Sequence, residues 1–381
     1  MSMLVPTAEQ KRLAAAVGRV LTRYTRRWNQ ARSGHLVSDL GELLGSVRGM
    51  VGRGASPDAS NRGDRKFWGW GYDNDGPHPL LVEVFLEYLR ERFGLDTFVD
   101  IPAPRIEDIE LRTPRFDLPE ELEAFCKADP FTRASHSYGK AFRDIVRGLH
   151  GQFDNPTDYV AFPETEAQLE ALLRFGASAN VALVVYGGGS SVTGGVNPTR
   201  SSRYRGVITV DMARFDRLIE VDQISRVAQV QAGMRGPALE AALKPSGLSA
   251  RFYPQSFEFS TVGGWIATRA GGHYCTLYTH IDDIVQAVRV VTPSGVHETP
   301  RLPASGAGIG QERLWLGSEG TLGIITEAWI RLHARPRFRS SSTVRFATFE
   351  AGVEAVRALS QSKLYPVNCR LVDALEAASM G

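Results

Sequence analysis

The feature that most constrains this chain is a glycine-rich loop at residues 187–195. A β-branched run, Val184-Val185, leads into the loop, and five glycines then fall within nine positions, with Ser190, Ser191 and Thr193 among them. Glycine lets the backbone approach a ligand closely, and successive N–H groups in such a loop bind anions. The loop therefore predicts a site that binds a diphosphate group.

Two familiar phosphate-binding loops are excluded by the surrounding residues. A P-loop would continue with Lys followed by Ser or Thr, and that pair is absent after the glycines. The fingerprint Gly-x-Gly-x-x-Gly fails because Val192 stands at its final position, and the next predicted element is a strand instead of a helix. Asp211 ends that strand, but without the helix it is not predicted to bind a ribose. An ordinary turn between strands would need fewer glycines.

Composition and charge describe an ordinary globular protein. The 381 residues suffice for two or three domains, and a net charge of +2 gives no indication of a nucleic-acid partner. Cys126, Cys275 and Cys369 are widely spaced and odd in number, so we expect neither a disulfide framework nor a metal site. No signal peptide or membrane-spanning run is evident. We therefore expect a cytoplasmic protein without a bound metal.

The sequence divides into four predicted regions, at residues 1–63, 64–155, 156–335 and 336–381. The first is an N-terminal helical extension and linker, whose helix at residues 1–32 has an apolar stripe. The remainder of that helix is basic, with Lys11, Arg12, Arg19, Arg23, Arg26 and Arg27. That helix is expected to pack on its own protein or, as the alternative, to lie on an anionic membrane. The second region has four aromatic residues within 67–72 and a helix from Leu80 to Phe93, ended by Gly94.

From Pro156 onward, predicted strands and helices alternate. Thr165 and Gln168 form a capping box that begins one helix, and Pro237 stands at the start of another that runs through Leu243. Strands are predicted at 206–211, 218–222, 226–232, 285–292, 296–299 and 324–332. Because strands outnumber helices and several are joined as hairpins, the predicted fold class is α+β instead of a regular doubly wound sheet.

Two further glycine-bearing segments occur in the same region. Residues 255–272 place hydroxyl groups and paired glycines at a predicted helix start, a position that favours anions. Residues 317–323 lead into the last predicted strand and likewise combine glycines with hydroxyl residues. Three such segments within about 140 residues indicate one long ligand that spans a domain.

Together these motifs resemble the vanillyl-alcohol-oxidase flavoprotein superfamily, and within it the alkyldihydroxyacetonephosphate synthase-like FAD-linked oxidases. The motifs that carry the resemblance are Tyr186–Gly195, Ser256–Gly264, Thr268–Ala270 and Gly317–Ile324, with Trp68–Tyr72 and Asn368–Asp373 extending it over residues 64–381. It implies a PCMH-type FAD-binding domain of two α+β subdomains, followed by the start of an α+β cap domain. In the family the cap continues, with a catalytic tyrosine and a histidine-rich loop, so we expect the cap to be incomplete at Gly381.

The resemblance also implies specific site residues. The implied FAD contacts are Val185, Tyr186, Gly187, Gly188, Gly189, Ser190, Ser191, Gln255, Ser256, Phe257, Glu258, Phe259, Ser260, Thr261, Thr268, Arg269, Ala270, Gly271, Glu319, Gly320, Thr321, Leu322, Gly323, Ile324 and Ile325. The group Val185–Ser191 would hold the diphosphate, where a Cβ on Gly188 would crowd the phosphates. Since that loop has no histidine, FAD is expected to be non-covalent. Arg370 is implied as a catalytic residue that binds a substrate phosphate, with a surface salt bridge as the alternative.

Three functions follow from the resemblance. The first is exchange of an acyl chain for a fatty alcohol on acyl-dihydroxyacetone phosphate, a step of ether-lipid synthesis. The second is oxidation of a 2-hydroxy acid by hydride transfer to flavin, and the third is a flavin-binding module without turnover. The expected partner is a small-molecule or lipid-phosphate substrate, with peripheral membrane contact and a homodimer also allowed. His273 and Tyr274 either face the flavin or have a plain buried or surface role.

Overall fold

The computed structural model describes residues 64–74, 79–95, 97–99, 101–198, 201–303 and 305–374. The predicted helix at residues 1–32 and the linker before residue 64 lie outside these ranges. Within the described part of the chain, no helix has both the length and the apolar character needed to cross a bilayer.

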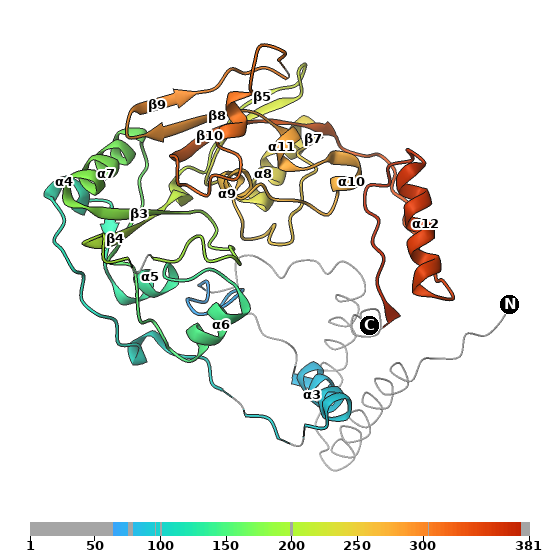
Figure 1. Cartoon of the computed structure of the whole chain (residues 1–381), viewed down its shortest axis with the longest axis horizontal. Coiled ribbons are helices and arrows are strands. Elements are labelled where there is room, and N and C mark those ends of the chain that lie inside the picture. Colours follow the sequence, from blue (N-terminus) through green and yellow to red (C-terminus); the bar gives the residue numbers. More distant parts are fainter. Residues whose placement is uncertain are drawn as a thin grey trace.

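The first sheet has four strands in the order β1-β2-β4-β3, three of them parallel (Figure 1). The strands are β1 (Cys126–Lys127), β2 (Tyr159–Ala161), β3 (Val181–Tyr186) and β4 (Gly206–Asp211), with β1 antiparallel at the edge. All residues of β4 are buried, as expected for a strand between two neighbours. The predicted strand before the glycine loop is therefore β3, and its parallel partner β4 follows the loop.

Helix α7 (Glu166–Ala179) connects β2 to β3 and covers this sheet. It begins at the predicted capping box, where the Thr165 hydroxyl accepts a hydrogen bond from the Gln168 N–H. Leu169 and Leu172 of the helix are fully buried in one cluster with residues of β4. Three short helices precede it, α4 (Glu120–Glu123), α5 (Pro130–Ser135) and α6 (Phe142–Leu149). A single 3-10 turn at Ile106–Asp108 comes before them.

The second sheet has five strands, all antiparallel, in the order β5-β6-β10-β8-β9. They are β5 (Leu218–Asp222), β6 (Val227–Gln231), β8 (Val285–Thr292), β9 (Gly295–Glu298) and β10 (Ile324–Arg331). The predicted hairpin is confirmed, because β8 pairs with β9 across the turn that ends at Gly295. A small ribbon of β7 (Leu248–Ser249) and β11 (His333–Ala334) lies outside both sheets. One mainly parallel sheet and one antiparallel sheet confirm the α+β prediction.

The main core lies between the second sheet and its helices, which Figure 1 shows gathered beside it. These helices are α8 (Gly236–Leu243), α9 (Val262–Ala267), α10 (Cys275–Tyr278) and α11 (Ile281–Ile284). Short 3-10 turns lie at Met212–Arg214, Lys244–Ser246 and Gln311–Leu314. The two subdomains are joined through Arg289 of β8, whose guanidinium donates to both carboxylate oxygens of Glu166 at 2.8 and 2.9 Å.

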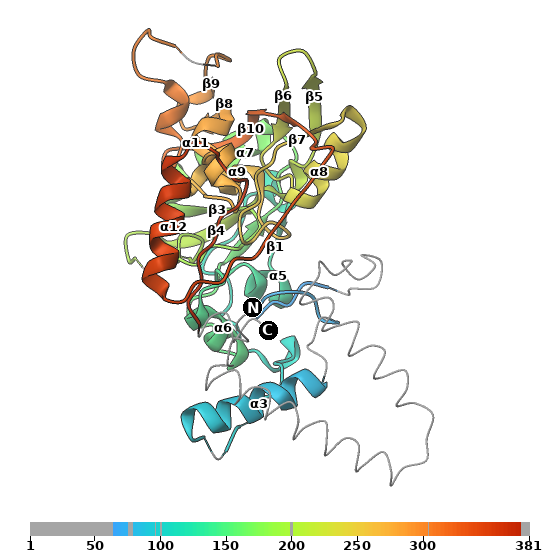
Figure 2. The same cartoon turned by 90° about the vertical axis from the view of Figure 1, so that its right-hand side faces the viewer.

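Two longer helices lie outside this two-sheet body. Figure 2 shows α3 (Pro79–Phe93) below it and α12 (Phe349–Gln361) along one side. The predicted end of the first of these is confirmed, since Gly94 follows it with φ of +65°. Helix α12 begins at Thr348, whose hydroxyl accepts from the Ala351 N–H.

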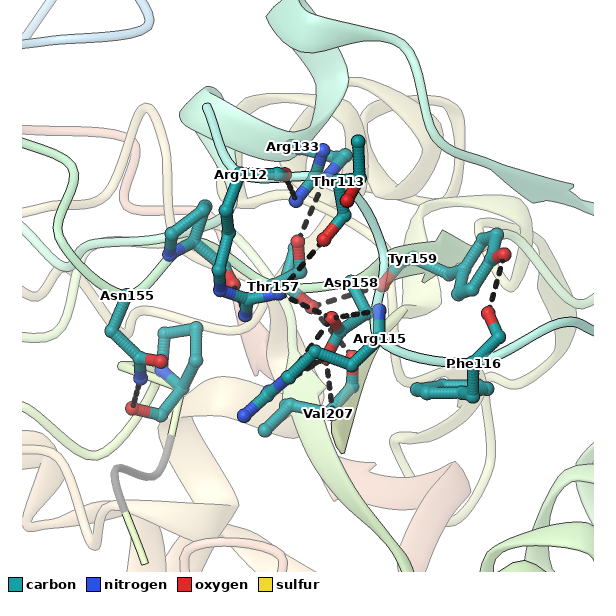
Figure 3. A network of polar contacts seen from close by, with 12 residues as sticks. Arg112, Thr113, Arg115, Phe116, Arg133, Asn155, Thr157, Asp158, Tyr159 and Val207 are labelled. Carbon is teal, nitrogen blue, oxygen red and sulfur yellow. Dashed lines mark hydrogen bonds and ion pairs between the residues drawn. The ribbon is translucent and has the colours of Figure 1, made fainter. Parts of the chain in front are cut away.

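A buried carboxylate fixes the start of the first sheet. Asp158 is 0% exposed and accepts hydrogen bonds from Arg112 and Arg115 at 2.5 and 2.7 Å (Figure 3). It also accepts from the Val207 N–H of β4 at 2.7 Å. Burial acts to raise the pKa of Asp158, but the hydrogen bonds from both arginines and Val207 outweigh it, so its pKa lies below 3.8. The ionised carboxylate therefore stabilises the fold.

We predict that Asp158→Asn destabilises the protein by about 3 kcal/mol at neutral pH, because it leaves two partly buried arginines without their anion. A carboxylate with a depressed folded-state pKa stabilises above its unfolded pKa and loses that contribution as pH falls. The difference from wild type should therefore shrink below about pH 4. Urea unfolding from pH 7 to pH 3 measures this, with the exposed Asp216→Asn as the control. A difference that is constant over this range would contradict the assignment.

Candidate functional site

A cleft lies where the two subdomains meet. It is lined by Val185, Gly187, Ser191, Gly195, Val196, Met212, Ala232, Thr261, Gly263, Gly264, Ala267, Thr268, Glu319, Gly320, Gly323 and Ile325. The empty space measures about 620 Å³ out to where it opens into solvent. Because most of these residues are small, an extended ligand would lie directly against the backbone of both subdomains.

The three predicted glycine segments all reach this cleft. Predicted FAD contacts that line it are Val185, Gly187, Ser191, Thr261, Thr268, Glu319, Gly320, Gly323 and Ile325. The other predicted contacts, which do not line it, are Tyr186, Gly188, Gly189, Ser190, Gln255, Ser256, Phe257, Glu258, Phe259, Ser260, Arg269, Ala270, Gly271, Thr321, Leu322 and Ile324. Thus each of the three segments has some residues that line the cleft and others that lie away from its lining.

Several lining residues were missed by the sequence reasoning. Gly195, Gly263 and Gly264 stood inside the recognised motifs but were not selected as contacts. Met212 and Ala232 directly follow β4 and β6. Their position directly after a predicted strand could have indicated that they line the site, because the ends of these two strands meet at the cleft. No sequence feature indicated that Val196 and Ala267 line the cleft.

The glycine loop presents a row of backbone donors. In the described part of the chain, the N–H groups of Gly188, Gly189, Ser190 and Ser191 make no hydrogen bond with the protein. Gly188 and Gly189 are buried and Ser190 and Ser191 are half-buried. Because backbone donors removed from water are nearly always paired, this run of N–H groups indicates that something outside the chain accepts from them. Consecutive N–H groups of this kind form an anion-binding nest. The loop therefore fits the diphosphate of a dinucleotide.

The two subdomains touch through this loop. A Cβ on Gly188 would lie 1.9 Å from the Phe259 carbonyl oxygen, and one on Gly187 would lie 2.4 Å from Thr261 Oγ1. Gly188 is thus required by the protein's own packing, which differs from the expectation that a Cβ there would crowd the phosphates. Segment 255–260 supports the loop from behind, and Phe259 also packs against Trp70 and Tyr72.

Cations lie against the same loop. Arg65 donates to the Gly188 carbonyl at 2.9 Å with its guanidinium 5.2 Å from the centre of the Phe259 ring. The Lys140 N–H donates to the Ser191 carbonyl at 2.7 Å, and the Lys140 side chain is 6% exposed. Burial, then repulsion from Arg65, lowers the pKa of Lys140 to about 8, against an opposing attraction to Asp144. This positive surrounding favours an anion at the loop.

The start of helix α9 contributes open space to the cleft, whereas its backbone N–H groups are not available to a ligand. Its predicted start is confirmed, with Thr261 Oγ1 accepting from the Gly264 N–H. The next N–H groups are used inside the protein, Val262 to Met234 and Gly263 to Ala232. The helix start is therefore not the anion site that the sequence suggested. A Cβ on Gly264 would meet only Thr261 Oγ1, at 3.2 Å, so the space beside this glycine is open for a flat ring system.

A histidine–aspartate pair was missed by the sequence reasoning. His136 Nε2 lies 2.8 Å from Asp211 Oδ2, and the other carboxylate oxygen accepts from the Ala213 N–H. The imidazole packs 4.5 Å from the ring of Tyr186, whose hydroxyl donates to the Ser135 carbonyl. Burial raises the pKa of Tyr186 to about 12, so this hydroxyl stays protonated. Asp211 therefore fixes the carboxyl ends of β3 and β4.

The remaining sequence candidates lie away from the cleft lining. Arg370 is exposed in the segment after α12, and none of the described cleft-lining residues comes from that segment. His273 is exposed, whereas Tyr274 packs against Tyr253 and lies under the guanidinium of Arg251. Arg269, a predicted cofactor contact, is instead paired with Asp282. The assignment of Arg370 to a substrate phosphate stays a prediction.

Comparison with known proteins agrees with the geometry. Residues 157–299 match the family described as FAD binding domain. Alkyldihydroxyacetonephosphate synthase of Dictyostelium discoideum is 37% identical over 282 residues, which are 72% of this chain and 46% of that protein. The mitochondrial D-lactate dehydrogenase [cytochrome] 1 of Saccharomyces cerevisiae is 30% identical over 217 residues, 56% of this chain and 36% of that protein.

A solved structure of an alkyldihydroxyacetonephosphate synthase superposes with a TM-score of 0.68 at 32% identity, covering 80% of this chain and 61% of that one. The chain thus spans about half the length of the curated synthase it matches. At this identity both the fold and the sequence are related. The chain carries an FAD binding domain at residues 157–299, and over most of its length it is related in sequence and structure to the alkyldihydroxyacetonephosphate synthases.

Proposed function

We propose that this protein is a flavoenzyme that binds FAD non-covalently in the cleft between its two subdomains. The observation that carries the proposal is the row of unpaired N–H groups at Gly188–Ser191 beside a cleft of small residues. The loop would hold the diphosphate, and the open space beside Gly264 would take the flexible chain and ring. Bound there, FAD would supply the redox chemistry, whereas the protein orients it and sets the local charge.

For the reaction, we propose the activity of the synthase relatives. The enzyme would exchange the acyl chain of acyl-dihydroxyacetone phosphate for a fatty alcohol. Support comes from the relationship to the synthases, which is stronger in identity and in coverage than the relationship to the lactate dehydrogenase. Arg370 would bind the substrate phosphate, since its exposed guanidinium presents paired donors to such a group.

A second candidate is oxidation of a 2-hydroxy acid. It is favoured by the 30% identity over 217 residues to a protein named D-lactate dehydrogenase. The two reactions differ in their electron balance. Oxidation passes two electrons from substrate to the cofactor and needs a later acceptor, whereas the alkyl exchange is redox-neutral. A third candidate, a flavin-binding module without turnover, would show cofactor but neither reaction. Contact of residues 1–32 with a membrane and a homodimer stay predictions.

The first prediction from this proposal contrasts two glycines. Gly264→Leu should keep the fold, because its Cβ meets only Thr261 Oγ1, at 3.2 Å, and a small shift of that hydroxyl accommodates it. It should weaken FAD binding about tenfold or more, since the side chain fills the cleft. Gly188→Ala should lower the unfolding midpoint as well, because its Cβ meets the Phe259 carbonyl. FAD titration by fluorescence together with thermal unfolding measures both effects. The control is Gly306→Ala, where a Cβ meets nothing within 4 Å.

Acid precipitation of the FAD-loaded protein tests the mode of attachment. We expect the yellow colour in the supernatant, because no histidine in the Val185–Ser191 loop is placed to form a covalent link. Colour that stays in the washed pellet would refute non-covalent binding. If Gly264→Leu binds FAD as tightly as wild type, then the cleft is not the cofactor site.

Anaerobic titration separates the two reactions. For the full-length protein with acyl-dihydroxyacetone phosphate and a fatty alcohol, we expect ether product and an unchanged amount of oxidised flavin at completion, because no electrons leave the substrates. Arg370→Ala should raise KM for the phosphate substrate more than about tenfold, which corresponds to loss of a charge-assisted hydrogen bond. Stoichiometric flavin bleaching by D-lactate, with no ether product from the lipid pair, would favour the second candidate. Arg357→Ala, on exposed α12, is the control.

A further inference from the structure

A second cleft lies on the opposite side of the glycine loop from the proposed cofactor site. It is lined by Ser137, Tyr138, Arg143, Arg147, Asn155, Thr193, Gly194, Asn197 and Pro198, and its empty space measures about 810 Å³ out to where it opens into solvent. Its lining is polar, in contrast to the small-residue lining of the first cleft. Residues Thr193 and Gly194 face this polar cleft, whereas Ser191 and Gly195 line the first one.

Two arginines of α6 give the polar cleft its charge. Arg143 and Arg147 are four residues apart, so they lie on the same face of the helix. Arg147 is half-buried, and in the described part of the chain its guanidinium makes no hydrogen bond or ion pair. Partial burial of a guanidinium costs free energy of hydration, and no hydrogen bond offsets that cost unless a ligand supplies the acceptors.

The loop adds donors to the same space. The Asn197 side-chain carbonyl accepts from the Gly139 N–H at 3.0 Å, which leaves its Nδ2 as a donor. A Cβ on Gly194 would lie 3.7 Å from Arg143 Nη2 and 3.9 Å from Asn197 Nδ2, so both donors converge beside this glycine. Thr193 brings a hydroxyl to the same lining. Donors therefore outnumber acceptors around the cavity.

The nearby charges do not cancel the two arginines. Asp144 is the carboxylate closest to Arg143, 3.8 Å from its Nε, but it is fully buried and also attracts Lys140. With Asp144 and Lys140 offsetting one another, Arg143 and Arg147 remain as excess positive charge. Planar guanidinium groups that converge with amide and hydroxyl donors suit a tetrahedral dianion better than a neutral ligand.

We propose that this polar cleft is a second anion site, which binds the phosphate group of a small organic phosphate against the outer side of the glycine loop. The volume exceeds that of a phosphate ion, so the site has room for the organic part as well. Arg147 and Arg143 bind the phosphate oxygens, and Asn197 Nδ2 with the Thr193 hydroxyl complete the set. The site does not depend on which reaction the first cleft supports.

The test is calorimetric titration of the FAD-loaded chain with inorganic phosphate at constant ionic strength. Saturating FAD occupies the backbone nest, and an Arg370→Ala background removes the proposed substrate-phosphate contact, so phosphate that binds reports the polar cleft. We expect saturable binding, with Arg147→Ala weakening it about tenfold or more. Asn197→Asp should weaken it similarly, because it keeps the acceptor for Gly139 but replaces the donor with a negative charge. Glycerol 3-phosphate should bind at least as tightly as phosphate.

Three controls keep the proposal testable. Arg174→Ala removes an exposed arginine of α7 and should leave phosphate binding unchanged. FAD affinity and the unfolding midpoint should be unchanged in Arg147→Ala, which separates the two sites. The proposal is overturned if the wild-type protein shows no saturable phosphate binding, or if Arg147→Ala binds phosphate as well as wild type. Acetate that binds as tightly as phosphate would overturn the assignment to phosphate.

Discussion

The close contact between the glycine loop and segment 255–261 determines the rest of the site. The backbone at Gly188 approaches the Phe259 carbonyl so closely that any Cβ would overlap it. This contact joins the mainly parallel subdomain to the antiparallel one and sets the width of the cleft between them. A side chain at this position would separate the two subdomains before it could touch a ligand. The glycines thus serve the packing of the protein first, and the binding of an anion follows from that packing.

The same contact explains which backbone groups of the loop are free. The Gly188 carbonyl accepts from Arg65 and the Ser191 carbonyl accepts from the Lys140 N–H, so these two acceptors of the loop are occupied inside the protein. Its N–H groups make no such bonds in the described part of the chain. A loop with bound carbonyls and unpaired N–H groups has a positive electrostatic potential. The nearby Lys140 increases that potential, although burial lowers the pKa of its ammonium.

Asp158 and Asp144, two of the buried carboxylates of this subdomain, differ in how completely they are paired. Asp158 has two arginines and a backbone N–H as partners, and it fixes the start of β2 to β4. Asp144 has two buried oxygens without a hydrogen bond, and it lies among Lys140 and Arg143 beside the glycine loop. A fully paired buried charge stabilises the fold, whereas an incompletely paired group marks a place where a ligand or water completes the set. The network around Asp158 is therefore structural, whereas Asp144, which lines neither cleft, has two acceptor oxygens that a hydrogen-bond donor such as water would satisfy.

Much of this protein was determined by local sequence. The capping box at Thr165, the proline at the start of α8 and the alternation of β10 each encode their element within a few residues, so these predictions were confirmed. The three glycine segments all reach one cleft, as the prediction of a single long ligand requires. Sequence could not show that the start of α9 uses its own donors, that Phe259 requires Gly188, or that His136 binds Asp211. Those contacts join residues from different elements, often tens of positions apart, and only the packing of the two subdomains brings them together.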